Sequence, residues 1–187
     1  MAFQDYALME GFDQFSTVAE LAATHSDVNT GVTTLSSDTP FGFGQSMYIS
    51  DGYNERLTMG TTLPSAANTY TLWAQVRFKL TGSRDTGVSA HLLAWQDGRN
   101  EAESAYSCFR CWEASTGGFY ALGYSGTLKT LPNLRDGAWH LLEVAVYQAD
   151  STNGWWQVLL DGSIVGFDSG FDNNYLNYEN QKYLTGF

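Results

Sequence analysis

A two-residue alternation of apolar and polar positions constrains the fold of this chain most. In segment 70–80 every second residue is apolar, and the residues between them are polar or aromatic. Successive side chains of a strand point to opposite faces of a sheet. The segment is therefore predicted to be a strand with one face in a core and the other exposed. The apolar set is Tyr70, Leu72, Ala74, Val76, Phe78 and Leu80.

The same alternation recurs along the chain, whereas helical spacing is nearly absent. Asp161-Gly162 is typical of a hairpin turn between two such segments. The one stretch compatible with a helix begins at Thr17, which would cap it, with Glu20 three residues later. The chain is thus predicted to be all-β. Strands are expected at 3–9, 46–49, 56–59, 70–80, 88–95, 105–112, 119–124, 139–148, 155–160 and 163–167.

The charge balance limits the classes of partner that the chain is expected to bind. Twenty acidic residues against nine Lys and Arg give a net charge of −11. Such a field repels nucleic acid and anionic membranes, and neither is expected as a partner. A basic protein surface, a neutral glycan or a metal ion stays open. The N-terminus resembles no signal peptide and no stretch is long enough to span a membrane, so synthesis in the cytoplasm without export is expected.

Two stretches carry a resemblance to a known family. Residues 136–144 (DGAWHLLEV) and 156–162 (WQVLLDG) resemble the paired strand and hairpin of laminin-G-like and concanavalin-A-like jelly rolls. The resemblance covers residues 40–167 and implies a two-sheet antiparallel jelly-roll sandwich. Gly11-Phe12-Asp13 is similar to the start of virion proteins of tailed bacteriophages that carry such a jelly roll.

This resemblance implies a non-enzymatic virion protein, located in the virion. The expected function is capsid decoration or cementing through contacts with the major capsid protein or other virion proteins, with homo-oligomerisation. The alternatives are a carbohydrate-binding, lectin-like module on a phage tail or host-contact structure and, more distantly, a glycoside hydrolase. A glycosidase needs two carboxylates flanking the scissile bond. No predicted strand carries such a same-face pair, so no catalytic residue is expected.

The expected organisation is one jelly-roll domain, 1–167, including the strand at 3–9, followed by an aromatic and Asn-rich arm, 168–187. Exposed aromatic residues in a segment of low charge are costly unless they meet a partner. The tail is therefore predicted to contact a neighbouring protein or subunit, and packing on its own domain is the alternative. The expected contact residues are Phe167, Phe171, Tyr175, Tyr178, Tyr183 and Phe187.

A second candidate surface combines aromatic rings with amide and charged neighbours, which suits sugars. Its alternative is packing of these aromatics under loops or against a subunit. Arg77 and Glu143 are expected to form a cross-strand charge pair on it. The predicted lining is Trp73, Gln75, Arg77, Glu143, Tyr147, Trp155 and Gln157.

No metal site or cofactor is predicted. Cys108 and Cys111 form a single C-x-x-C, and positions i and i+3 of a strand face opposite ways, so two buried free thiols are expected. Calcium is the one weaker candidate, because oxygen ligands cluster in two places without the spacing of a defined loop. These ligands are Asp51, Asn54 and Glu55 in one loop, and Asp168 and Asp172 in the tail.

Overall fold

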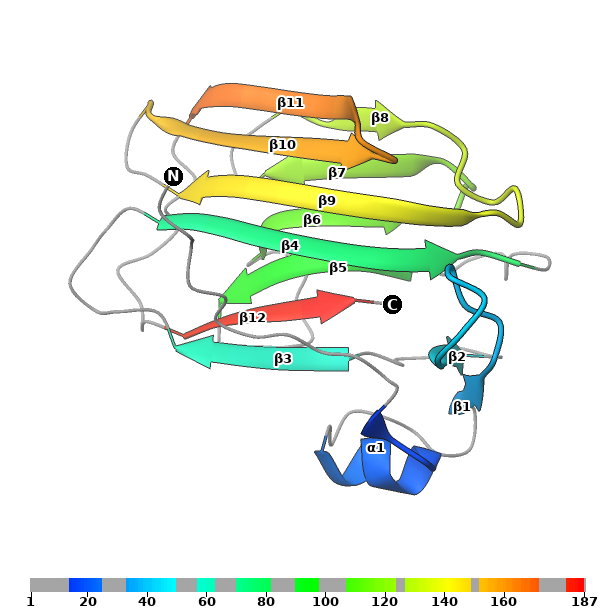
Figure 1. Ribbon diagram of the computed structural model, residues 1–187. Coiled ribbons are helices and arrows are strands. Elements are labelled where there is room, and N and C mark those ends of the chain that lie inside the picture. Colours follow the sequence, from blue (N-terminus) through cyan, green and yellow to red (C-terminus); the bar gives the residue numbers. More distant parts are fainter. Residues whose placement is uncertain are drawn as a thin grey trace.

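Two antiparallel sheets face each other and form a jelly-roll sandwich, which confirms the predicted fold class (Figure 1). The computed structural model describes nine segments of the chain. They are residues 14–24, 33–49, 57–62, 70–81, 90–97, 107–123, 127–148, 152–171 and 181–186. The predicted strand at 3–9 lies outside these segments.

One layer is a four-stranded sheet with the order β11-β10-β9-β4. The alternation read from the sequence holds here, since Leu142, Val144 and Val146 are buried while the residues between them face outward. The ends of these strands lie within one or two residues of the predicted ends, except that β11 extends four residues beyond its predicted end. Their bounds are Tyr70–Lys79 (β4), Trp139–Gln148 (β9), Gly154–Leu160 (β10) and Ser163–Phe171 (β11).

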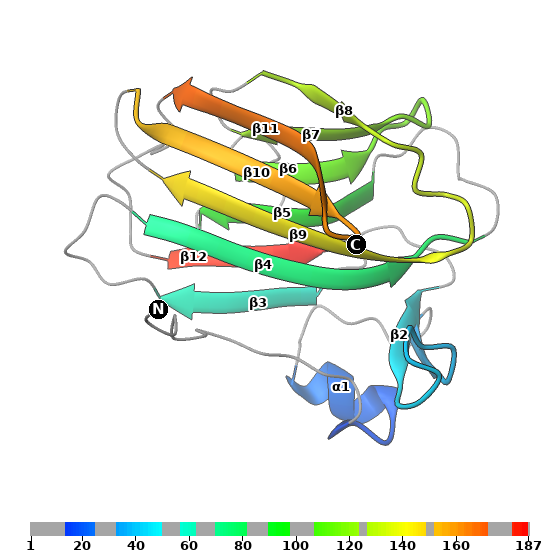
Figure 2. The same ribbon diagram turned by 45° about the horizontal axis from the view of Figure 1, so that its top comes forward.

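The other layer is a six-stranded sheet with the order β3-β12-β5-β6-β7-β8. Figure 2 shows it lying behind the four-stranded sheet, with β8 close to β11 at one side. Two of its strands, β8 and β12, were not predicted. The bounds are Leu57–Thr62 (β3), Ala90–Asp97 (β5), Ser107–Glu113 (β6), Phe119–Gly123 (β7), Lys129–Leu131 (β8) and Gln181–Gly186 (β12).

The C-terminal segment differs from the predicted arm. Residues 181–186 form β12, which pairs with β3 on one side and β5 on the other. This part of the tail, Tyr183 included, therefore packs as a strand inside its own sheet, because backbone pairing on both edges satisfies its polar groups. Phe167 and Phe171 belong to β11. Tyr175, Tyr178 and Phe187 lie outside the described residues.

A small subdomain of one helix and one hairpin sits beside the sandwich (Figure 1). The helix α1 spans Val18–Thr24, and the hairpin joins β1, Thr33–Ser36, to β2, Ser46–Ile49. As predicted, the Thr17 hydroxyl caps the helix by accepting from the Glu20 amide at 3.2 Å. The Glu20 carboxylate in turn accepts from the Ser16 amide at 2.8 Å.

The core between the two sheets is built around Trp156 of β10, which is fully buried. Its ring lies 5.3 Å from the ring of Phe109. A Cβ at Gly123 would come within 2.5 Å of the indole, and one at Gly166 within 3.1 Å. Glycines of β7 and β11 thus make room for the largest side chain of the core.

The predicted hairpin turn between β10 and β11 is confirmed. Asp161 has a φ of 51° and Gly162 a φ of 79°. Positive φ at both central residues is the mark of the turn type that matches strand twist, and Asp-Gly is well suited to it.

Candidate functional site

Three side chains meet on the outer face of the six-stranded sheet. Arg110 and Trp112 alternate with buried neighbours along β6, and Tyr120 is the cross-strand partner of Trp112 on β7. The Trp112 and Tyr120 rings lie 5.7 Å apart, and the Arg110 guanidinium carbon lies 4.4 Å from the Trp112 ring centroid. We call Arg110, Trp112 and Tyr120 the six-strand face.

Arg110 has no acidic partner within the described part of the chain. The Arg110 guanidinium stacks on Trp112, and the nearest carboxylate along β6, that of Glu113, faces inward and binds Arg135 at 2.7 Å. Burial lowers the pKa of the Arg110 guanidinium below its ordinary value, although it stays charged at neutral pH. A partly buried cation without a counter-ion is costly, and an anion placed over it would offset that cost.

The sequence reasoning did not find the six-strand face. Residues 105–112 were predicted to be a strand and Cys108 and Cys111 to be buried thiols, but no binding site was expected there. The signal was present, because Phe109, Cys111 and Glu113 alternate with Arg110 and Trp112, and the first three are all buried. An arginine and a tryptophan at i and i+2 of a strand place a cation beside an aromatic ring on one face.

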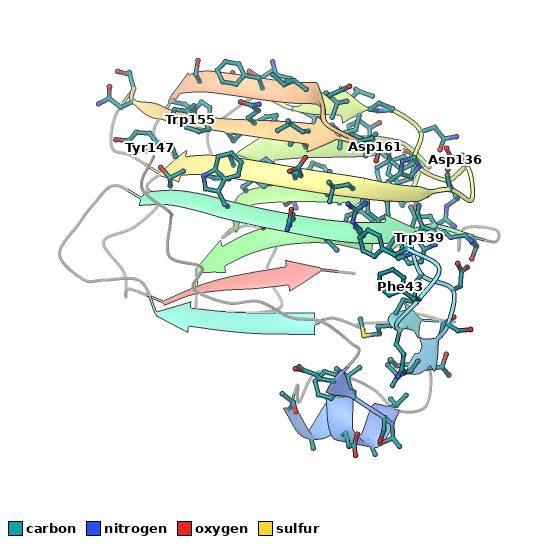
Figure 3. The ribbon with its side chains drawn as sticks, in the orientation of Figure 1. Phe43, Asp136, Trp139, Tyr147, Trp155 and Asp161 are labelled. Atoms are coloured by element: carbon teal, nitrogen blue, oxygen red, sulfur yellow. The ribbon has the colours of Figure 1, made fainter. Side chains whose placement is uncertain are left out.

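The predicted sugar-binding residues do come together. Trp73, Gln75 and Arg77 alternate on β4, Glu143 and Tyr147 on β9, and Trp155 and Gln157 on β10. All seven lie on the outer face of the four-stranded sheet, where the Tyr147 and Trp155 rings stack with centroids 6.0 Å apart and planes at 23°. We call these seven residues the four-strand face; Figure 3 labels Tyr147 and Trp155 at one end of it.

One predicted interaction on the four-strand face is wrong. Arg77 and Glu143 form no ion pair, because the register places Gln75 opposite Glu143 and Leu141 opposite Arg77. The Arg77 guanidinium lies instead 4.8 Å from the ring of Phe41, in the loop between β1 and β2. That loop is fixed by Asp38, which accepts from Lys79 at 2.7 Å and from the Trp139 indole at 3.0 Å.

His140 of the Trp-His motif bridges two acids that the sequence did not suggest as its partners. Its Nδ1 lies 2.8 Å from Asp161 Oδ2 and its Nε2 lies 3.0 Å from Asp136 Oδ1. Desolvation alone would lower the His140 pKa, but the hydrogen bonds to Asp161 and Asp136 outweigh it and raise the pKa. Asp161 also accepts from the Leu141 amide at 2.8 Å. The arrangement ties the β10–β11 turn to the start of β9 (Figure 3).

The residues considered for metals do not form a site in the described segments. No group of three His, Cys, Asp or Glu residues there could hold an ion. Asp168 accepts from the amides of Thr127 and Ser169, whereas Asp51, Asn54, Glu55 and Asp172 fall outside these segments. Cys111 is a buried free thiol whose pKa is raised by burial. Cys108 lies in β6, and its side chain is not described.

Comparison with known proteins identifies similar folds. No protein-family model and no curated protein matches the chain. Among solved structures, an endo-β-1,4-glucuronan lyase from the fungus Trichoderma reesei has a TM-score of 0.54 at 13% identity, over 82% of this chain and 74% of the lyase. A mutant of the alginate lyase Aly36B in complex with an alginate tetrasaccharide has a TM-score of 0.54 at 12% identity, over 94% of this chain and 83% of the lyase.

At this level of identity the likeness establishes a shared β-sandwich fold. It also corrects two expectations drawn from the phage resemblance, those of a virion structural protein and of a chain without enzymatic activity. The two structures named above are polysaccharide lyases, and neither connects the chain with a virion. In the described segments, no helix is both long and apolar enough to cross a membrane.

Proposed function

We propose that this chain binds an acidic polysaccharide on the six-strand face and cleaves it by β-elimination. The observation that carries the proposal is Arg110, a partly buried cation that stacks on Trp112 and has no counter-ion among the described residues. A uronic acid unit supplies both things that this pair lacks, a carboxylate for the guanidinium and a flat sugar face for the indole.

The net charge of −11 makes a local cation such as Arg110 a requirement for binding a polyanion. An acidic protein repels a polyanion in general, so binding needs a local site where the potential is reversed. Arg135 and Lys79 do not provide one, because each is paired with a carboxylate, Glu113 and Asp38 respectively. Among the described residues Arg110 has no carboxylate partner, as is also true of Arg77 and Lys129, and it stacks on Trp112 beside Tyr120. The glucuronan and alginate lyases of similar fold act on chains of this kind, as their names state.

The elimination step needs a group that stabilises negative charge on the carboxylate, a base and an acid. A guanidinium bound to the uronate carboxylate stabilises the negative charge that develops there. A base then removes the proton from the adjacent carbon, the electron pair forms a carbon–carbon double bond, and the bond to the neighbouring sugar oxygen breaks. That oxygen takes up a proton, and no water is consumed. One group on the same side of the ring can serve as both base and acid.

Tyr120 is the candidate for the proton transfer. It lies on the six-strand face, and its position is diagonal to that of Arg110, at a Cβ separation of about 7–8 Å. The Trp112 ring contacts both side chains, and the Tyr120 hydroxyl lies beside Gly118, toward the end of β7 away from the position opposite Arg110. His91 takes the register position opposite Trp112 on β5 and is the second titratable residue at this part of the sheet.

The test is formation of unsaturated sugar ends, followed by ultraviolet absorbance, on glucuronan, polymannuronate and polyguluronate. The wild-type protein is expected to release such ends from at least one of them. Replacing Arg110 by Ala should lower the rate about 10²–10³-fold, as expected for removal of one charge-stabilising donor. Arg110→Lys should retain part of the rate, because the point charge remains while the planar stacking is lost.

Arg77→Ala is the matched control, since Arg77 is a cation on the opposite side of the sandwich. Its rate should equal that of the wild type, and circular dichroism should show both variants folded. An unchanged rate in Arg110→Ala, or an equal loss in Arg77→Ala, would contradict the assignment of the site.

A further inference from the structure

Aromatic side chains form a band across the whole four-stranded sheet, on the side of the sandwich away from Arg110. Each strand contributes one ring. Trp73 of β4 is 53% exposed and Phe167 of β11 is 51% exposed. Between them, Tyr147 of β9 and Trp155 of β10 stack on each other. Because strands lie about 4.8 Å apart, the band is about 14 Å wide.

Side chains cover the middle of the band. Ala145 sits in its middle, with Trp73 as partner on one side and Gln157 on the other, and is 1% exposed. The larger neighbours therefore cover the backbone at this point. The near-parallel rings of Tyr147 and Trp155 suit the apolar C–H face of a pyranose ring, which stacks on an exposed aromatic surface and does not require a deep pocket.

Polar groups beside the band have no partner within the described part of the chain. The side chains of Gln75, Gln157 and Glu143 form no hydrogen bond or ion pair there. Gln157 lies in the same cross-strand row as Trp73, with Ala145 between them. Gln75 and Glu143 occupy opposite register positions in the next row along the strands. Amide and carboxylate groups supply both donors and acceptors to hydroxyls, and their fixed places on strands give orientation.

The charge on the four-strand face selects a neutral occupant. Within the described segments, Glu143 lies one row from Trp73 and Gln157, whereas Arg77, the exposed cation of this face, lies two rows from them and over the Phe41 ring. A polyanion on the band would meet this carboxylate and the overall charge of −11, with the nearest described cation of the face two rows away. Hydroxyl groups, by contrast, can donate to Glu143.

Further aromatic surface lies at the other end of the face. Phe41 and Phe43 stack at 5.9 Å, and Phe43 is 73% exposed. Figure 3 shows Phe43 near Trp139, at the end of the sheet away from Tyr147 and Trp155. Trp139 and Tyr147 are eight residues apart on β9, a span of about 26 Å. This length exceeds a single sugar and suits a chain.

We propose that the four-strand face is a second glycan site, which holds a neutral polysaccharide by stacking on Trp73 and the Tyr147–Trp155 pair while Gln75, Gln157 and Glu143 bind its hydroxyls. It goes beyond the elimination proposed for the opposite face and does not depend on it. A chain with both sites attaches to an uncharged polymer through one sheet and presents the other to an acidic one.

Calorimetric titration with cellohexaose, mannohexaose and xylohexaose tests this site. At least one of these neutral hexasaccharides is expected to bind the wild type saturably. Trp73→Ala and Trp155→Ala should each weaken that binding about tenfold or more, because each removes a stacking surface. Trp155→Phe should restore part of it. Leu128→Ala is the control, since Leu128 is a half-exposed apolar residue outside the two faces, and it should bind as the wild type does.

Three outcomes would overturn the proposal. The first is no binding of any of the three sugars at millimolar concentration. The second is equal binding by the two tryptophan variants. The third is self-association of the wild type that Trp73→Ala abolishes, which would assign the band to a second copy of the chain. Arg110→Ala separates the two sites, because it should lose cleavage of the acidic polymer and keep the neutral hexasaccharide.

Discussion

Two arginines, Arg110 on β6 and Arg135 in the connection between β8 and β9, show how partners decide a residue's role. Arg135 donates to the Glu113 carboxylate from Nη2 at 2.7 Å and from Nε at 3.1 Å, and its Nη1 donates to the Thr81 carbonyl. This pairing fixes the 132–135 segment to the end of β6. Within the described segments, Arg110 has an aromatic ring in place of an acid. The same side chain is thus structural in one place and available for a ligand in the other.

Gly123 is expected to tolerate no side chain. A Cβ there would lie 2.5 Å from Cδ1 and 2.7 Å from Nε1 of the fully buried Trp156, and 3.2 Å from Cζ of Phe171. Gly123→Ala should therefore lower the free energy of unfolding by about 1–3 kcal/mol, the usual cost of overpacking. Denaturant unfolding followed by tryptophan fluorescence measures it.

Gly166→Ala is the matched comparison, because it also faces Trp156 but at 3.1 Å from the edge of the ring. The ring edge can shift by a few tenths of an ångström, so this variant should lower the free energy of unfolding less than Gly123→Ala does. Equal costs, or a greater cost at Gly166, would show that Trp156 is packed differently.

At the scale of elements, the Asp136–His140–Asp161 cluster joins a strand to a distant turn. The His140 pKa is raised in the folded protein, so its contribution to stability is complete below about pH 6.5 and is lost as pH rises through the folded pKa. The pKa values of Asp136 and Asp161 are lowered, chiefly by the Ala138 amide for the first and by His140 for the second. Their contribution is lost as pH falls below about 4.

Urea unfolding of wild type and His140→Gln should therefore differ more at pH 5.5 than at pH 8.5. The imidazolium binds two carboxylates at the lower pH, whereas the neutral ring at the higher pH does not carry the charge that attracts them. A difference in stability that is the same at both pH values would mean that His140 acts through shape alone.

The strands of the four-stranded sheet could be read from the sequence, because its inner face is buried and its outer face is polar or aromatic. The period of two then fixes both the strand and the face, as Trp73 and Val144 show. The strand β12 could not be read in this way. Residues 181–186 contain one aliphatic side chain, and the pairing of β12 with β3 and β5 depends on contacts far apart in sequence.

The two candidate sites also differ in how far they could be predicted from the sequence. The residues of the four-strand face lie at alternate positions of strands that were predicted, so their grouping followed from the pattern. The six-strand face needed the pairing of β6 with β7, which brings Tyr120 opposite Trp112. Sequence spacing does not give that register, because two short strands with a Gly-rich connection can pair in several ways.

At the scale of the whole molecule, the sandwich buries the inner faces of its sheets and leaves the two outer faces for ligands. Among the described residues, one carries a cation without a counter-ion and the other an aromatic band with unpaired amides. In a protein with a net charge of −11, the two proposed sites would distinguish ligands by their charge. The fold itself is shared with lyases and decides neither site.

The mass of the products from a uronate polymer tests the central claim most directly. Elimination adds no water to the cut bond, so each new non-reducing end should be unsaturated and lighter by one water than the end left by hydrolysis. Mass spectrometry of a glucuronan, polymannuronate or polyguluronate digest is predicted to show this series with wild type and to lose it with Arg110→Ala. Saturated products alone, or intact polymer in all three digests, would contradict β-elimination on the six-strand face.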